Sequence, residues 1–166
     1  MKKQFILCTI SLLFCFIQVG AQSVNFETAK QVALSFFNSR AQQPVSGMRQ
    51  VIPPATVAQS KTQETYFVFE PLRGQGFVIV AADKKAPPIL GYSVSNQFKF
   101  EKMAATNLAL MDQYDQQIQA IRKSQYSAPL EVTNAWNALS ANTFAGAESN
   151  RTVWHLLTSE WDQTYP

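Results

Sequence analysis

The first regular pattern lies between Phe26 and Arg40. Apolar side chains recur there at intervals of three and four residues, which places them on one face of a helix. They are Ala29, Val32, Ala33, Phe36 and Phe37. Asn25 precedes the segment, and its side chain suits the N-cap position. The pattern predicts an amphipathic helix over Phe26 to Arg40 whose apolar face packs against another element.

Two β-rich runs flank a short turn segment in the middle of the chain. Thr65 to Glu70 and Phe77 to Ala82 are rich in aromatic and β-branched residues, and residues 71–76 between them contain Pro71, Gly74 and Gly76. This combination predicts a β-hairpin. A third strand is expected at Ile89 to Ser93. Shorter strands are expected at Arg49 to Ile52 and Gln97 to Phe100.

A second amphipathic helix is expected over Asn107 to Lys123. Its apolar residues lie on one side, and the apolar face that they form is wide enough to cover one face of a small sheet. The predicted class is α+β, a small antiparallel sheet in hairpin and meander order with two or three helices packed on one face. The next segment, Ser124 to Arg151, is rich in Ser, Ala, Asn and Thr. They are predicted to form a linker containing a short helix around Asn134 to Leu139.

The first 21 residues have the organisation of a secretory signal peptide. Lys2 and Lys3 precede an apolar run from Phe5 to Val19, and Val19-Gly20-Ala21 provides small residues before Gln22. The run is shorter than the ~20 residues of a membrane-spanning helix. We therefore expect cleavage near Ala21, export to the periplasm, cell surface or medium, and no membrane association after cleavage.

Cleavage at that point changes the chemistry available to the chain. Both cysteines, Cys8 and Cys15, lie in the leader, so the exported chain has neither a disulfide nor a thiol nucleophile. Lys+Arg falls from 14 to 12 against 11 Asp+Glu, a net charge of +1. Without a basic stripe to neutralise phosphates, nucleic-acid binding is not expected.

Candidate catalytic groups are isolated along the chain. His155 is the only histidine and has no cysteine to activate and no second histidine with which to hold a metal. Asp83 follows a predicted strand, and an aspartate at such a position is more often a turn residue than a catalytic base. Gly74-Gln75-Gly76 lies between two strands and does not open a helix, so it is interpreted as a turn. No cofactor or metal site is expected.

Specific segments resemble a known family. Tyr66 to Phe69 and Gly76 to Ser93 are similar to the prosegment of streptopain-like cysteine peptidases and to stand-alone inhibitors of the Spi type. The similarity extends to the Ala29 to Phe37 helix and to Tyr114 with Gln117-Ile118. Leu156-Leu157 with Trp161 to Pro166 resembles the opening of the family's mature enzyme.

The resemblance implies a division into four parts: leader 1–21, Spi-like domain 22–123, linker with the processing region 124–151, and the start of a cysteine peptidase domain at 152–166. In the family the nucleophilic cysteine and the histidine follow the Trp-x-Gln segment, and this sequence stops at Pro166 before either. Gln163 matches the oxyanion-hole glutamine in name only, because it has no nucleophile to serve. The chain itself is therefore not expected to be an enzyme.

By resemblance, the prosegment blocks the active-site cleft through the loop that leads into its C-terminal helix, here Phe98 to Asn107. Asn107 is the expected contact, with Lys102, Met103 and Thr106 beside it. An equally good interpretation makes Asn107 the N-cap of the following helix. The two roles are compatible, because a side chain at a helix start is exposed and directed.

Three hypotheses follow. The chain is the prosegment of a secreted cysteine peptidase, occluding the catalytic domain in cis and assisting its folding. Alternatively, it is a free-standing inhibitor that binds a streptopain-like peptidase in trans. A third interpretation, an extracellular binding module with no connection to proteases, rests on the residue pattern alone.

Overall fold

The computed structural model describes residues 22–53 and 64–141. In this part of the chain, four strands form one antiparallel sheet in the order β1-β2-β3-β4. The strands are β1 (Met48–Gln50), β2 (Tyr66–Pro71), β3 (Phe77–Ala81) and β4 (Ile89–Ser93), and the helices are α2 (Phe26–Arg40), α3 (Ala105–Lys123) and α4 (Leu130–Ser140), with a 3-10 turn η2 (Phe100–Lys102). The predicted α+β class is confirmed.

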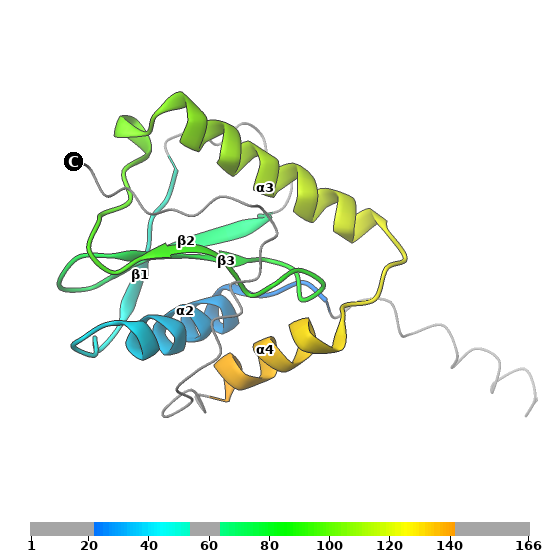
Figure 1. Ribbon diagram of the computed structural model, residues 1–166, viewed down its shortest axis with the longest axis horizontal. Coiled ribbons are helices and arrows are strands. Elements are labelled where there is room, and N and C mark those ends of the chain that lie inside the picture. The colour runs from blue at the N-terminus through cyan, green and yellow to red at the C-terminus, as the bar shows by residue number, and fades with distance from the viewer. Residues whose placement is uncertain (1–21, 54–63, 142–166) are drawn as a thin grey trace, which may run out of the picture.

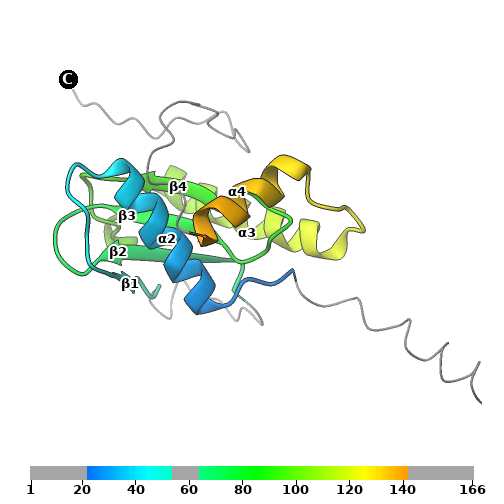
Figure 2. The ribbon, with the colours of Figure 1, turned by 90° about the horizontal axis from the view of Figure 1, so that it is seen from below.

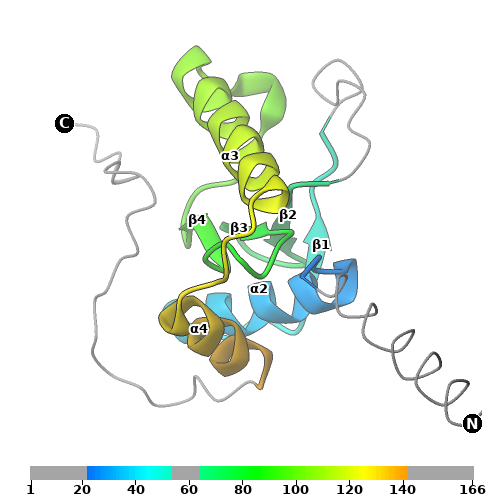
Figure 3. The ribbon, with the colours of Figure 1, turned by 90° about the vertical axis from the view of Figure 1, so that its right-hand side faces the viewer.

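The helices cover both faces of the sheet, whereas the sequence pattern predicts all of them on one face. α3 lies over one face, and α2 and α4 lie together over the other (Figures 1 and 3). Seen from the α2 side, α4 lies next to α2 (Figure 2). The molecule is therefore three layers deep, with the sheet in the middle.

The composition of β3 explains this difference. A strand that faces solvent on one side alternates apolar and polar residues, but a strand covered on both sides is apolar throughout. All five residues of Phe77–Ala81 are buried. Val78 and Val80 join the core beneath α2, together with Phe67 and Phe69 of β2, and Ile79 joins the core beneath α3.

The predicted bounds of α2 agree with the structure. Asn25 caps the helix, because its side-chain oxygen accepts a 2.8 Å hydrogen bond from the backbone N–H of Thr28. Val32, Phe36 and Phe37 are buried on the sheet side. The local capping signal and the apolar periodicity thus agree with the tertiary packing.

The turn between β2 and β3 depends on Gly76. Its φ is +116°, a conformation that side-chain-bearing residues rarely adopt. A Cβ atom at this position would lie 2.5 Å from a ring carbon of Phe37 and 2.7 Å from the carbonyl oxygen of Ser93. Gly76 therefore permits the close approach of α2, the turn and the end of β4.

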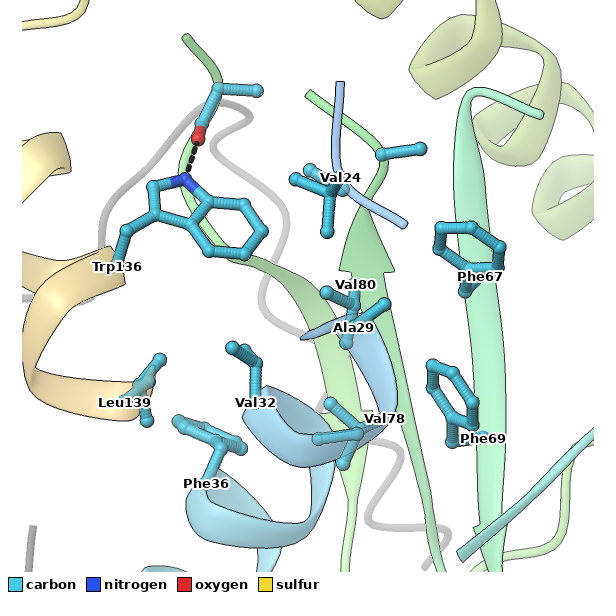
Figure 4. Close-up of a cluster of buried hydrophobic side chains, with 14 of the residues drawn as sticks. Val24, Ala29, Val32, Phe36, Phe67, Phe69, Val78, Val80, Trp136 and Leu139 are labelled. Carbon is cyan, nitrogen blue, oxygen red and sulfur yellow. Dashed lines mark hydrogen bonds between the residues drawn. The ribbon is translucent and has the colours of Figure 1, made fainter. Parts of the chain in front are cut away.

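α4 lies within the segment that the sequence assigns to a linker. Val132, Trp136 and Leu139 are buried in the same core as Val32. Figure 4 shows the hydrogen bond of the Trp136 indole as a dashed line, which joins it to the carbonyl oxygen of Ala86, and shows Leu139 near Val32 and Phe36. The helix is longer than the predicted Asn134 to Leu139, and residues 130–140 belong to the packed domain.

The loop after β3 joins distant parts of the chain. The Lys85 ammonium donates to the carbonyl oxygen of Ser124 (2.8 Å), at the end of α3. The backbone N–H of Val24 donates to Ala82 (3.1 Å), which holds the N-terminal segment against the sheet. In the described ranges, no helix is long and apolar enough to cross a membrane.

The strand predicted at Gln97 to Phe100 is not formed. Residues 96–99 have no regular structure, and Phe100 begins η2. Phe98 and Phe100 are both buried. Their apolar side chains are needed for packing against the sheet, and not for a strand within it.

Candidate functional site

The η2 loop, residues 98–107, connects the sheet to α3. Two of its aromatic residues fasten it to the sheet. The ring of Phe98 packs edge-to-face on Phe77 with centroids 5.1 Å apart, and Phe100 packs on Phe98 at 4.8 Å. Edge-to-face packing aligns the positive edge of one ring with the negative face of the next. All three rings are buried, so the start of the loop is anchored in the core beneath α3.

A carboxylate also holds the start of the loop. Glu70, in β2, accepts a 3.0 Å hydrogen bond on Oε1 from the backbone N–H of Phe98. Its other oxygen, Oε2, lies 3.2 Å from the guanidinium of Arg49 in β1. The Glu70 side chain is 12% exposed and that of Arg49 is 64% exposed. The carboxylate thus links the η2 loop to two neighbouring strands.

The residues expected to contact a peptidase follow this anchor. Lys102 and Thr106 are exposed, while Met103 and Asn107 are half-buried. Met103 packs against the core beneath α3. The four residues belong to one short stretch of chain from η2 to the first turn of α3. Whether they contact an enzyme remains a proposal.

The N-cap interpretation of Asn107 is wrong. α3 begins at Ala105, and its N-cap is Ala104, which offers no side-chain hydrogen bond. Asn107 is the third residue of the helix, and its backbone N–H donates to the carbonyl oxygen of Ala104 (3.0 Å). Among the residues that the structure describes, the Asn107 side chain forms no hydrogen bond. It is therefore not engaged in capping.

Asp83 is a structural turn residue, as the sequence favours. It is buried, and Oδ1 accepts a 2.9 Å hydrogen bond from the backbone N–H of Lys85. Its Oδ2 lies 3.5 Å from Nε of Arg122, on α3. The carboxylate stabilises the loop and links it to the end of α3, and the described ranges contain no histidine or cysteine for it to activate.

One titratable side chain in this part of the protein is strongly perturbed. The pKa of Tyr66 is raised from 10.0 to about 12, first by burial and then by the nearby carboxylates of Asp115 and Asp112, which disfavour a second negative charge. Asp115 accepts a hydrogen bond from the buried hydroxyl of Thr65. This polar pair joins the start of β2 to α3, on the same face as the η2 loop.

Two residues considered for chemistry, His155 and Gln163, lie outside the described residues. Within residues 22–53 and 64–141, no group of three His, Cys, Asp or Glu side chains is placed to hold a metal ion. The turn interpretation of Gly74 and Gly76 is confirmed, since both have positive φ between β2 and β3.

Sequence reasoning missed Glu70. A carboxylate at the end of an apolar strand looks like an ordinary solvent-facing residue, and its partner is a backbone N–H 28 residues later. Phe98 and Phe100 did offer a signal in the sequence. Two phenylalanines within three residues, in an otherwise polar segment, indicate a loop that is anchored in the core.

Comparisons with known proteins identify the family. The chain is similar to the "Thiol protease/hemagglutinin PrtT" of Porphyromonas gingivalis, with 24% identity over 158 residues, which is 93% of this chain. The chain spans only 18% of the length of that relative. Residues 21–118 match the family model described as Spi protease inhibitor. This match extends from the residues before α2 into α3 and includes the whole η2 loop, and the chain therefore belongs to the Spi protease inhibitor family.

Proposed function

We propose that this chain is the prosegment of a secreted, streptopain-like cysteine peptidase, which it keeps latent by occluding the active-site cleft. The observation that carries the proposal is the family match over residues 21–118. The name of the relative adds support, since a thiol protease is the class of enzyme that such an inhibitor would control.

The η2 loop is the part of the domain that we propose enters the cleft. An inhibitory segment binds well when its bound shape already exists in the free protein, because less conformational freedom is lost on binding. The loop meets this requirement: Phe98 is fastened to the sheet by a hydrogen bond and by ring packing. Lys102 and Thr106 then present exposed side chains a few residues further on.

Within this loop we propose Asn107 as the residue that reaches the peptidase, with Lys102, Met103 and Thr106 beside it. Two observations support Asn107. Its side chain is not used as a helix cap, because the cap position is Ala104. It also lies in the first turn of a 19-residue helix that packs on the sheet, so its backbone position is well defined.

The alternative is a free-standing inhibitor that acts on a cysteine peptidase in trans. The family name is compatible with either arrangement. The resemblance of Trp161 to Pro166 to the start of a mature enzyme favours the prosegment. Reading the gene beyond the codon for Pro166 separates the two. An open frame that reaches a cysteine and then a histidine supports the prosegment, and an immediate stop codon leaves only an inhibitor or a decayed gene.

Purified chain 22–166 should slow peptide cleavage by the thiol protease PrtT when the two are mixed in equimolar amounts. The matched control is the same concentration of chain unfolded by heat, tested for competition as a mere substrate. Unchanged protease activity in the presence of folded chain would rule out occlusion of that enzyme in trans. Expressing a catalytic domain with and without the chain tests the further proposal that the prosegment assists folding.

A further inference from the structure

Glu70 occupies a position that an inhibitory role for the η2 loop makes important. Its carboxylate is nearly buried, and its two oxygens serve different partners: Oε1 the backbone N–H of Phe98, Oε2 the guanidinium of Arg49. The partner on Oε2 is a flexible, largely exposed surface side chain. The partner on Oε1 is main chain, so Glu70 determines where the backbone of the loop runs.

The hydrogen bond to Phe98 comes at a critical point of the chain. Residues 96–99 have no regular structure, and no strand ladder therefore holds them in place. The ring of Phe98 packs against the ring of Phe77, and the backbone N–H of Phe98 is bound by Glu70. These two contacts together fix the position and the direction of the chain as it enters η2.

We propose that Glu70 is a positioning residue for inhibition: its carboxylate acts as a fixed acceptor that holds the η2 loop in the shape that the peptidase binds. The ion pair with Arg49 is dispensable, since a pair with one largely exposed partner contributes little. The essential feature is the acceptor oxygen of Glu70, because its removal leaves the Phe98 N–H without a fixed hydrogen-bond partner. This inference rests on the proposed function of the loop.

Four variants separate the acceptor from the charge. Glu70→Gln keeps an oxygen acceptor of the same length and removes the charge, while Glu70→Leu removes the acceptor at similar volume. Arg49→Gln removes the ion pair and leaves Glu70 intact. Glu70→Ala also removes the fixed protein acceptor. Because it leaves room for water at the Phe98 N–H, it serves as the acceptor-free variant if the leucine variant does not fold.

Inhibition of PrtT and amide hydrogen exchange are measured for each. We expect Arg49→Gln to inhibit within about twofold of wild type, and Glu70→Gln within about threefold, because a neutral acceptor forms a somewhat weaker bond. Glu70→Leu or Glu70→Ala should inhibit at least about tenfold more weakly, the range for a lost bond to a charged group. The Phe98 amide should exchange at least about tenfold faster in these variants, while the β3 amides keep their protection.

The outcomes distinguish this inference from the proposed function. If the wild-type chain does not inhibit PrtT, the proposed occlusion of that enzyme is wrong. The rate of amide hydrogen exchange at Phe98, compared between wild type and the Glu70 variants, then tests by itself whether Glu70 holds the loop. If wild type inhibits and the acceptor-free variant inhibits equally well, Glu70 does not position the loop for inhibition. Equal loss in Glu70→Gln and Glu70→Leu would also overturn the proposal, because it would make the charge the essential feature. Faster exchange throughout β3 in both Glu70→Leu and Glu70→Ala would overturn it too, because Glu70 would then stabilise the whole sheet rather than position the loop.

Discussion

The indole nitrogen of Trp136 donates a 2.8 Å hydrogen bond to the carbonyl oxygen of Ala86, a residue 50 positions earlier in the chain. Both residues are buried. The bond joins α4 to the loop after β3, and so it closes the core beneath α2. A buried carbonyl that loses its donor keeps the cost of leaving water, which makes this contact a sensitive measure of how firmly α4 is attached.

Replacing Trp136 should destabilise the whole domain. We expect Trp136→Ala to lower the free energy of unfolding by about 3 to 5 kcal/mol, the range for removing a large buried aromatic side chain. Trp136→Phe should cost less, about 1 to 3 kcal/mol, because it keeps most of the apolar area but leaves Ala86 without its donor. Urea unfolding followed by circular dichroism measures both. The exposed Asn134 on the same helix provides the control, and Asn134→Ala should change stability little.

A packed α4 also predicts where the chain resists cleavage. Proteases cut exposed, locally unfolded segments, so a helix whose buried side chains join the core is cut only after it detaches. We expect brief treatment with a broad-specificity protease to leave no product that ends between Leu130 and Ser140. Mass spectrometry of the fragments checks this. If the chain is a prosegment, as proposed, its processing within the predicted linker is expected outside α4, in residues 124–129 or 141–151. Early cuts inside α4 would contradict its attachment.

Asn107 offers a direct test of the proposed contact. Asn107→Lys places a longer, charged side chain at the proposed point of contact and should weaken inhibition of PrtT at least tenfold, or by about 1.4 kcal/mol of binding free energy. The unfolding midpoint should change little, because the wild-type side chain forms no hydrogen bond within the described residues. Gln113→Lys makes the same chemical change at an exposed site further along α3. If both variants inhibit as wild type does, the contact lies elsewhere in the loop.

Tyr66 predicts a loss of stability at alkaline pH. Its pKa is about 12 in the folded protein and about 10 in an unfolded chain. Between these values the unfolded chain has released the phenol proton while the folded chain retains it, so stability falls as pH rises from 10 to 12. After allowance for the solvent-facing part of the ring, the loss is about 1 to 2 kcal/mol.

The comparison with Tyr66→Phe isolates this effect, since lysines and other tyrosines titrate in the same range. Unfolding free energies of both proteins at pH 9 and pH 12 give two differences. The wild type should lose about 1 to 2 kcal/mol more than the phenylalanine variant over this interval. An identical pH dependence would show that Tyr66 titrates as an ordinary tyrosine.

Sequence patterns predict the parts of this fold that are specified locally. α2 has its predicted bounds because the Asn25 cap and the apolar spacing act within a few residues, and β4 matches because Ile89–Ser93 is bounded by prolines and polar residues. The second helix layer was missed although Phe77–Ala81 is apolar at every position, which is the pattern of a doubly covered strand. The attachment of α4 to Ala86 and of the η2 loop to Glu70 depends on residues far apart in sequence, and no local pattern reports such pairs.

The three-layer arrangement decides where this chain can be shortened without unfolding it. The family match ends at residue 118, yet Arg122 still donates to the carbonyl oxygens of Glu64 and Ala82, and Trp136 and Leu139 still fill the core. A fragment that stops at 118 would expose the part of this core that α4 covers and would lose the last turn of α3. The smallest piece expected to fold by itself therefore runs from Gln22 to Ala141, and the border recognised by similarity falls inside it.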